Sequence, residues 1–197
     1  MNQMTIPEKL ELAFSKRRLP EGRCALEHLS DYELDEVISF CQYAANEIDS
    51  DALETFSDVI YWLSEDAFVF YLPVFISVSI NENEPNLLVC HSLINMLDRS
   101  LAIENWDDFF AARWLKLTKS ECEPLIDWIL WLSGLDDSVY SDEALSRAFD
   151  VLTKLKEIKL AGQPLIESHS IIDAHPQVNT IDELAGHPVR RDKSARD

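Results

Sequence analysis

The fold depends on the most hydrophobic stretch of the chain, which reads Ser64-Glu65-Asp66-Ala67-Phe68-Val69-Phe70-Tyr71-Leu72-Pro73-Val74-Phe75-Ile76. Its aromatic and β-branched residues are compatible with a strand, especially over residues 75–80. A helix is favoured because Ser64 is a good N-cap and no hairpin turn follows the stretch. We therefore predict a buried helix that is kinked at Pro73.

The length of this apolar stretch argues against a membrane span. The longest run without a charged residue is 67–81, which is 15 residues, whereas a helix needs about 20 residues to cross a bilayer. The N-terminus has no basic region followed by an apolar segment, so no signal peptide is expected. We predict a cytoplasmic protein with no membrane contact.

Local helix signals surround this stretch on both sides. Capping boxes, in which a Ser or Thr precedes a Glu by three residues, begin at Thr5 and Ser30. Helices are expected at about 5–18, 30–48, 51–63, 64–80, 87–97, 106–115, 118–133 and 141–160. We predict an all-α fold, with a single domain of seven or eight helices inside 1–164. Residues 165–197 are expected to form a C-terminal extension that is mobile toward its end.

Two helix starts remain open in detail. Asp51 is expected to cap the helix of residues 51–63. For the helix that ends near Gly134, Thr118 begins a capping box, while Ser120 offers a later start that accommodates Pro124 better. Gly134 is expected just beyond the end of that helix.

The charge of the chain is concentrated in one segment. The protein has 36 Asp and Glu residues against 17 Lys and Arg residues, for a net charge of -19. Residues 24–112 contain 18 of these acids and one base, Arg99. Binding to nucleic acid or to an anionic membrane is disfavoured because phosphate contacts need clustered Lys and Arg. Compensation of this charge is expected from a basic partner, bound cations or the Lys-bearing C-terminal helices.

Two segments carry a family resemblance. The segment Trp62-Leu63-Ser64-Glu65-Asp66-Ala67-Phe68-Val69-Phe70-Tyr71-Leu72-Pro73 resembles the signature Leu-Ser-x-Glu-Ala-(Phe/Tyr)-x-(Phe/Tyr)-Tyr-Leu-Pro of a bacterial domain-of-unknown-function family, whose members often have Pro-Glu where Glu65-Asp66 stands. Residues 110–131 are similar to the second block of that family, although its Pro is displaced here to Pro124. The resemblance covers about 6–133. It implies an α-helical bacterial domain of cytosolic type, and it implies no activity.

Signals for catalysis or metal binding are absent from the sequence. The five histidines are His28, His91, His169, His175 and His187. None has metal-ligand spacing, and no nucleophile or phosphate-loop motif occurs. We predict that the protein is not an enzyme and holds no cofactor. One alternative is a metal-assisted hydrolase built from dispersed carboxylates and His91, and another is a structural homo-oligomer formed through residues 68–80.

The cysteines predict free thiols. They are Cys24, Cys41, Cys90 and Cys122, and no two of them form a CxxC pair. Cys41 falls on an apolar helical stripe and Cys90 lies in an apolar run. We expect small buried thiols in a reducing compartment.

The helix expected over 30–48 has an inward and an outward face. The inward stripe, at the spacing of 3.6 residues per turn, is Leu34, Val37, Ile38, Cys41, Ala45 and Ile48. Tyr43 then lies on the opposite side, beside Glu36 and Glu47. This face therefore presents a tyrosine among acids.

The helix expected over 51–63 repeats this arrangement. With Phe56 directed inward, Tyr61 lies well away from the core beside Glu54 and Asp58. Tyr is favoured at protein interfaces, although another helix covering these rings is an equally open explanation. The predicted partner-binding residues are Glu36, Tyr43, Glu47, Glu54, Asp58 and Tyr61.

Together these features predict an acidic protein-binding module. The expected partner is a basic protein that docks on residues 31–66, and its identity and the oligomeric state stay open. The most concrete hypothesis is an immunity protein that neutralises a basic effector such as a nuclease-type toxin.

Overall fold

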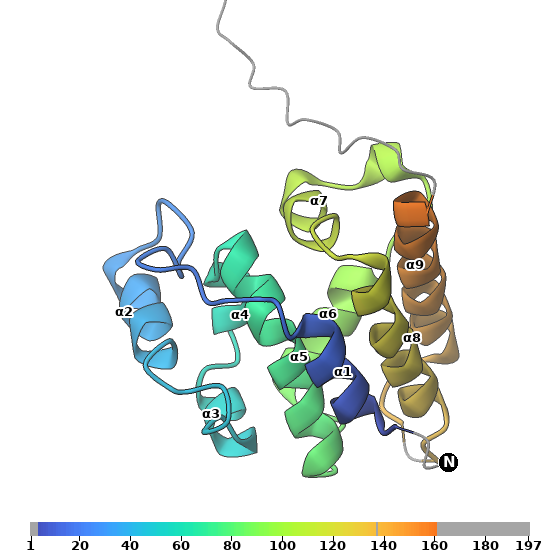
Figure 1. Cartoon of the computed structure of the whole chain (residues 1–197), viewed down its shortest axis with the longest axis horizontal. Coiled ribbons are helices and arrows are strands. Elements are labelled where there is room, and N and C mark those ends of the chain that lie inside the picture. Colours follow the sequence, from blue (N-terminus) through green and yellow to red (C-terminus); the bar gives the residue numbers. More distant parts are fainter. Residues whose placement is uncertain (1–3, 137, 161–197) are drawn as a thin grey trace, which may run out of the picture. The chain divides into compact units, whose positions relative to one another are not determined.

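The computed structural model describes residues 4–136 and 138–160, which form helices joined by turns and loops (Figure 1). In order, the helices are α1 (Ile6–Phe14), α2 (Asp31–Phe40), α3 (Ser50–Thr55), α4 (Val59–Trp62), α5 (Glu65–Asn81), α6 (Leu88–Leu97), the short 3-10 helix η1 (Ile103–Asn105), α7 (Asp108–Trp114), α8 (Lys119–Ser133) and α9 (Asp142–Leu160). The all-α class is confirmed. The predicted boundary at 164 and 165 lies outside the described residues.

Helix α5 is the centre of the core, and the strand alternative for residues 75–80 is wrong. The Ser64 hydroxyl accepts the N–H of Ala67, and the helix then runs for 17 residues with Pro73 inside it. Helices α1, α6 and α7 pack against it. Most of its side chains from Phe68 onward are buried within the chain, so the segment proposed for homo-oligomer contacts is occupied internally.

Helices α8 and α9 form the most extensive helix pair and lie side by side in Figure 1. The capping box at Thr118 begins α8, because the Thr118 hydroxyl accepts the Glu121 N–H and the Glu121 carboxylate accepts the Thr118 N–H. The later start at Ser120 is therefore wrong. Pro124 is tolerated near the beginning of the helix, where few N–H groups have helical partners. Gly134 ends the helix, as expected, with a right-handed backbone.

Helix α2 ends at Phe40, eight residues before the end that its apolar pattern predicts. The Phe40 ring is fully buried and lies 4.9 Å from the ring of Tyr71 and 6.0 Å from that of Phe75. The chain turns after Cys41 and brings Ile48 back into the core. Tertiary packing thus decides where α2 ends, since these contacts come from α5 and not from α2 itself.

The single helix expected over 51–63 is divided in two, which is why the predicted number of helices was too low. Asp49, not Asp51, caps α3 by accepting the N–H of Ala52. The chain leaves helical geometry at Phe56, with φ −110° and ψ 35°, and α4 begins at Val59. The break places Phe56 against the ring of Phe40, 5.8 Å away.

Asp107 stabilises the start of α7, and its removal has a predictable cost. Its carboxylate accepts the N–H of Phe110 at 2.7 Å and pairs with Arg99 at 2.9 Å, and these contacts lower its pKa, the Phe110 bond most. We expect Asp107→Ala to destabilise the protein by about 1 kcal/mol near neutral pH. Asp108→Ala, which removes the neighbouring acid, serves as the control and should change stability far less.

The same contact predicts a pH dependence. A carboxyl group with a lowered pKa stabilises the fold fully above its unfolded pKa of about 4, and that stabilisation is lost as the pH falls through the folded pKa. The difference in urea midpoint between wild type and Asp107→Ala should therefore shrink below about pH 4. A difference that stays constant into strong acid would contradict this role of the carboxylate.

Candidate functional site

The acidic segment meets few cations in the folded chain. Residues 24–63 contain ten carboxylates: Glu27, Asp31, Glu33, Asp35, Glu36, Glu47, Asp49, Asp51, Glu54 and Asp58. No ion pair joins any of them to a basic side chain of the described residues. The C-terminal half supplies partners only further along, where Lys116 pairs with Asp66 and Arg147 pairs with Asp98. Residues 24–63 therefore carry a negative charge that described cations leave uncompensated.

Helix termini accommodate part of this charge. Glu33 bonds to the hydroxyl and the N–H of Ser30, and these bonds lower its pKa. Asp31 lies in the same first turn of α2, where the helix dipole favours negative charge. Carboxylates placed in this way stabilise the fold locally and still face solvent, so they remain able to attract a basic partner.

Four of the predicted partner-binding residues are acids with different surroundings. Glu47 accepts the N–H of Ala44, and Glu54 accepts the N–H of Leu88 at the start of α6. Both thus have a structural role that the sequence pattern did not indicate. Asp58 precedes α4 without a capping bond and is exposed, whereas Glu36 is half-buried on α2.

The two predicted tyrosines are partly exposed and lie at different places in the fold. Tyr43 is 39% exposed and its ring lies 5.9 Å from that of Phe56, while Tyr61 is 37% exposed and stacks on Phe109 of α7 at 6.5 Å. Tyr43 and Glu47 follow the end of α2, so the helical face assigned to them is wrong. Each ring presents one side to solvent and rests its other side on a phenylalanine.

The apolar surface nearest the acids comes from two residues that the pattern predicted to be buried. Leu34 and Ile38 are 40% and 50% exposed on α2. They are four residues apart and therefore adjacent on one side of the helix, next to Asp31 and Asp35 on its outer face. We call this pair and its two acids the α2 strip. Its apolar centre with an acidic border is the feature that the sequence analysis missed.

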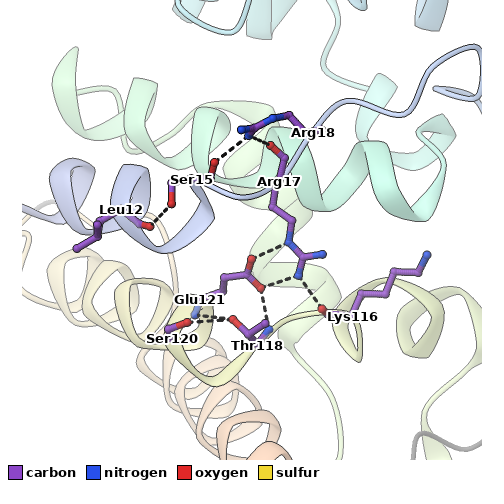
Figure 2. Close-up of polar contacts among 8 residues, drawn as sticks. All are labelled: Leu12, Ser15, Arg17, Arg18, Lys116, Thr118, Ser120 and Glu121. Carbon is purple, nitrogen blue, oxygen red and sulfur yellow. Dashed lines mark hydrogen bonds and ion pairs between the residues drawn. The ribbon is translucent and has the colours of Figure 1, made fainter.

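A second polar cluster lies where the turn after α1 meets the start of α8 (Figure 2). Arg17 donates from Nε and Nη2 to the two carboxylate oxygens of Glu121, at 2.6 and 2.7 Å, and from Nη2 to the carbonyl of Lys116 at 2.7 Å. Glu121 is 3% exposed and its carboxylate raises the pKa of Arg17. This ion pair fixes α1 to α8 by charge-assisted bonds in a protected position.

One arginine is buried without a carboxylate in contact. Arg113 is 1% exposed, lies 3.6 Å from the ring centre of Phe109 and donates to the carbonyls of Phe109 and Leu63. Burial lowers its pKa to about 10. Its carbonyl bonds connect α7 to the junction of α4 and α5, and the aromatic face of Phe109 stabilises the buried cation. We assign it a structural role.

The residues of the hydrolase alternative do not gather in the described part of the chain. No group of three His, Cys, Asp or Glu side chains suited to a metal ion occurs within 4–136 and 138–160. The His91 ring lies 4.8 Å from the ring of Tyr140. His169, His175 and His187 lie outside the described residues.

The cysteines differ in burial. Cys90 and Cys122 are fully buried, and burial raises the pKa of each thiol to about 12. Cys24 and Cys41 are half-buried, and burial likewise raises the pKa of Cys41 to about 12. All four are free. The expectation of buried thiols is thus confirmed for Cys90 and Cys122.

Comparison with known proteins adds no functional information. No helix of the described residues is both long and apolar enough to cross a membrane. No family model, no curated protein and no solved structure matches this chain. The resemblance to a bacterial family therefore stays a prediction, and the function has to be argued from the geometry.

Proposed function

We propose that this protein is a non-enzymatic, cytoplasmic binding protein that docks a basic protein through residues 31–66. The observation that carries the proposal is the α2 strip: Leu34 and Ile38 are exposed within a segment whose ten carboxylates have no described ion-pair partner. The most concrete form is an immunity protein that neutralises a nuclease-type effector.

The α2 strip has the composition of a protein interface. Such interfaces combine an apolar centre, which supplies affinity by leaving water, with a polar border that remains solvated. Leu34 and Ile38 supply the centre, and Asp31 and Asp35 supply the border on the same helix. Tyr43 and Tyr61 add partly exposed aromatic rings elsewhere in the segment.

The charge of the segment indicates the chemistry of the partner. A surface that grips phosphates is rich in Lys and Arg, and a dense group of carboxylates is complementary to it. Long-range attraction would accelerate association, and the bound acidic protein would then cover the surface that holds nucleic acid. An exposed group of acids with no internal partner suits this role because the partner supplies the missing cations.

The test uses a basic effector encoded beside this protein's gene, with association and dissociation rates measured by surface plasmon resonance. Asp35→Lys/Glu36→Lys/Asp58→Lys should lower the association rate at least tenfold at low ionic strength, about 0.01 M, and less at about 0.15 M. Leu34→Ser/Ile38→Ser should mainly raise the dissociation rate. All five positions are exposed or half-buried, so folding should survive.

The matched control places the same charge change outside the segment. Glu104→Lys/Asp108→Lys/Glu143→Lys alters three exposed acids on η1, α7 and α9. Its association rate should fall much less than that of the first variant. Equal effects of the two triple variants would show that only net charge matters, and the docking surface proposed here would be wrong.

A further inference from the structure

The fold assembles a cationic depression that no segment of the sequence predicts. An open cavity of about 560 Å³ is lined by Arg17 from the turn after α1, Lys116 from the link between α7 and α8, Lys119 from the first turn of α8, and Lys159 from the last turn of α9. Asp66, Leu115, Leu117 and Thr118 complete the lining. In a protein with a net charge of -19, four cations around one cavity call for a physical explanation.

The carboxylates at this depression neutralise only half of its positive charge. Glu121 is engaged by Arg17 through two bonds, and Asp66 pairs with Lys116 at 2.7 Å. Lys119 and Lys159 have no carboxylate within ion-pair distance among the residues that the structure describes. Four cations against two anions leave a local charge of about +2.

The two unpaired lysines occupy unfavourable positions for a cation. Lys119 is the first residue of α8, where the helix dipole is positive and favours an anion. Lys159 is half-buried, donates from Nζ to the carbonyl of Leu115, and has a pKa lowered by burial and by the charge of Arg17. An anion in the depression would relieve both arrangements.

We propose that this depression binds a phosphate group, either free or as the monoester of a small molecule. A phosphate dianion matches the local charge of about +2 and offers several acceptor oxygens to cations that surround it. Arg17 Nη1 makes no hydrogen bond to a described residue and is drawn without a dashed line in Figure 2, so this donor is open. Leu115 and Leu117 provide apolar wall for a small organic group.

The size of the anion follows from the rest of the charge. At physiological ionic strength, interactions between exposed charges are largely screened beyond about 8 Å. A compact dianion therefore responds to the four nearby cations more than to the distant acids of residues 24–63. An extended polyanion would reach those acids and be repelled, which is consistent with the exclusion of nucleic acid.

The experiment is a titration monitored by ³¹P NMR, with chloride keeping the ionic strength constant. The probes are inorganic phosphate and phenyl phosphate, and wild type should bind at least one with a Kd on the order of 1 mM. Tighter binding of phenyl phosphate would identify a monoester as the ligand class, and tighter binding of inorganic phosphate would identify the free ion. Failure of both probes to bind would overturn the proposal.

Two variants test the location. Lys119→Gln alters a fully exposed side chain, and Lys119→Gln/Lys159→Gln removes both unpaired charges. The double variant should weaken phosphate binding at least about tenfold, and the single variant should weaken it less. The matched control Arg23→Gln/Lys154→Gln removes two cations that do not line the depression. Similar affinities in control and double variant would reject this binding site, whatever the outcome for the basic partner.

Discussion

Replacing Arg17 with Met is expected to destabilise the protein by about 3 kcal/mol, because the buried Glu121 carboxylate loses its cation. Glu121 is 3% exposed and receives two of its hydrogen bonds from Arg17. The N–H of Thr118 still donates to it at 2.7 Å, which holds the cost at the lower end of the range for a broken buried pair. Urea denaturation near pH 7 measures the change.

The neighbouring arginine provides the control for this prediction. Arg18 is exposed and donates only to the backbone carbonyls of Ser15 and Arg17, so Arg18→Met should change stability by less than about 0.5 kcal/mol. Arg17→Met/Glu121→Gln should recover part of the loss, since a neutral amide is less costly to bury and can still accept from Thr118. A single variant as stable as Arg18→Met would show that the Glu121 carboxylate finds other solvation.

Helix starts could be predicted from the sequence because a cap is a local interaction. Thr5, Ser30 and Thr118 each bond to a glutamate three residues ahead, as the spacing predicts, and Ser64 caps α5. These bonds need only a few consecutive residues. Where the pattern offered two candidates, as at Asp49 and Asp51, the local signal was not sufficient to choose between them.

The candidate sites were less predictable because they depend on where distant segments meet. The concentration of acid in residues 24–112 is visible in the composition, but its lack of internal partners is a property of the fold. The cationic depression combines Arg17, Lys116, Lys119 and Lys159, which lie far apart in the chain. No charge pattern along the sequence marks that depression.

The faces of short helices were the least predictable feature, and α2 shows the reason. An apolar stripe assigns the inward face correctly only if the helix continues for the whole length of the pattern. Because α2 ends at Phe40, residues 41–48 no longer share its rotation, and the inward face is set by Val37 and Phe40. Ile38 is left exposed.

Phe40→Ala and Ile38→Ala therefore have opposite expected outcomes to those that the apolar stripe predicts. Phe40 is fully buried among the rings of Phe56, Tyr71 and Phe75, so its truncation should cost about 3 to 5 kcal/mol through lost burial and a cavity. Ile38→Ala removes a half-exposed side chain and should stay within about 0.5 kcal/mol of wild type.

The comparison of these two variants separates stability from binding. Urea denaturation of Phe40→Ala and Ile38→Ala tests the packing, and partner binding by Ile38→Ala tests the α2 strip. A stable Ile38→Ala variant that dissociates faster from the partner would assign Ile38 to the interface, because its apolar surface then has value only in the complex. A large loss of stability in Ile38→Ala would instead place Ile38 in the core and remove the apolar centre from the proposed docking surface.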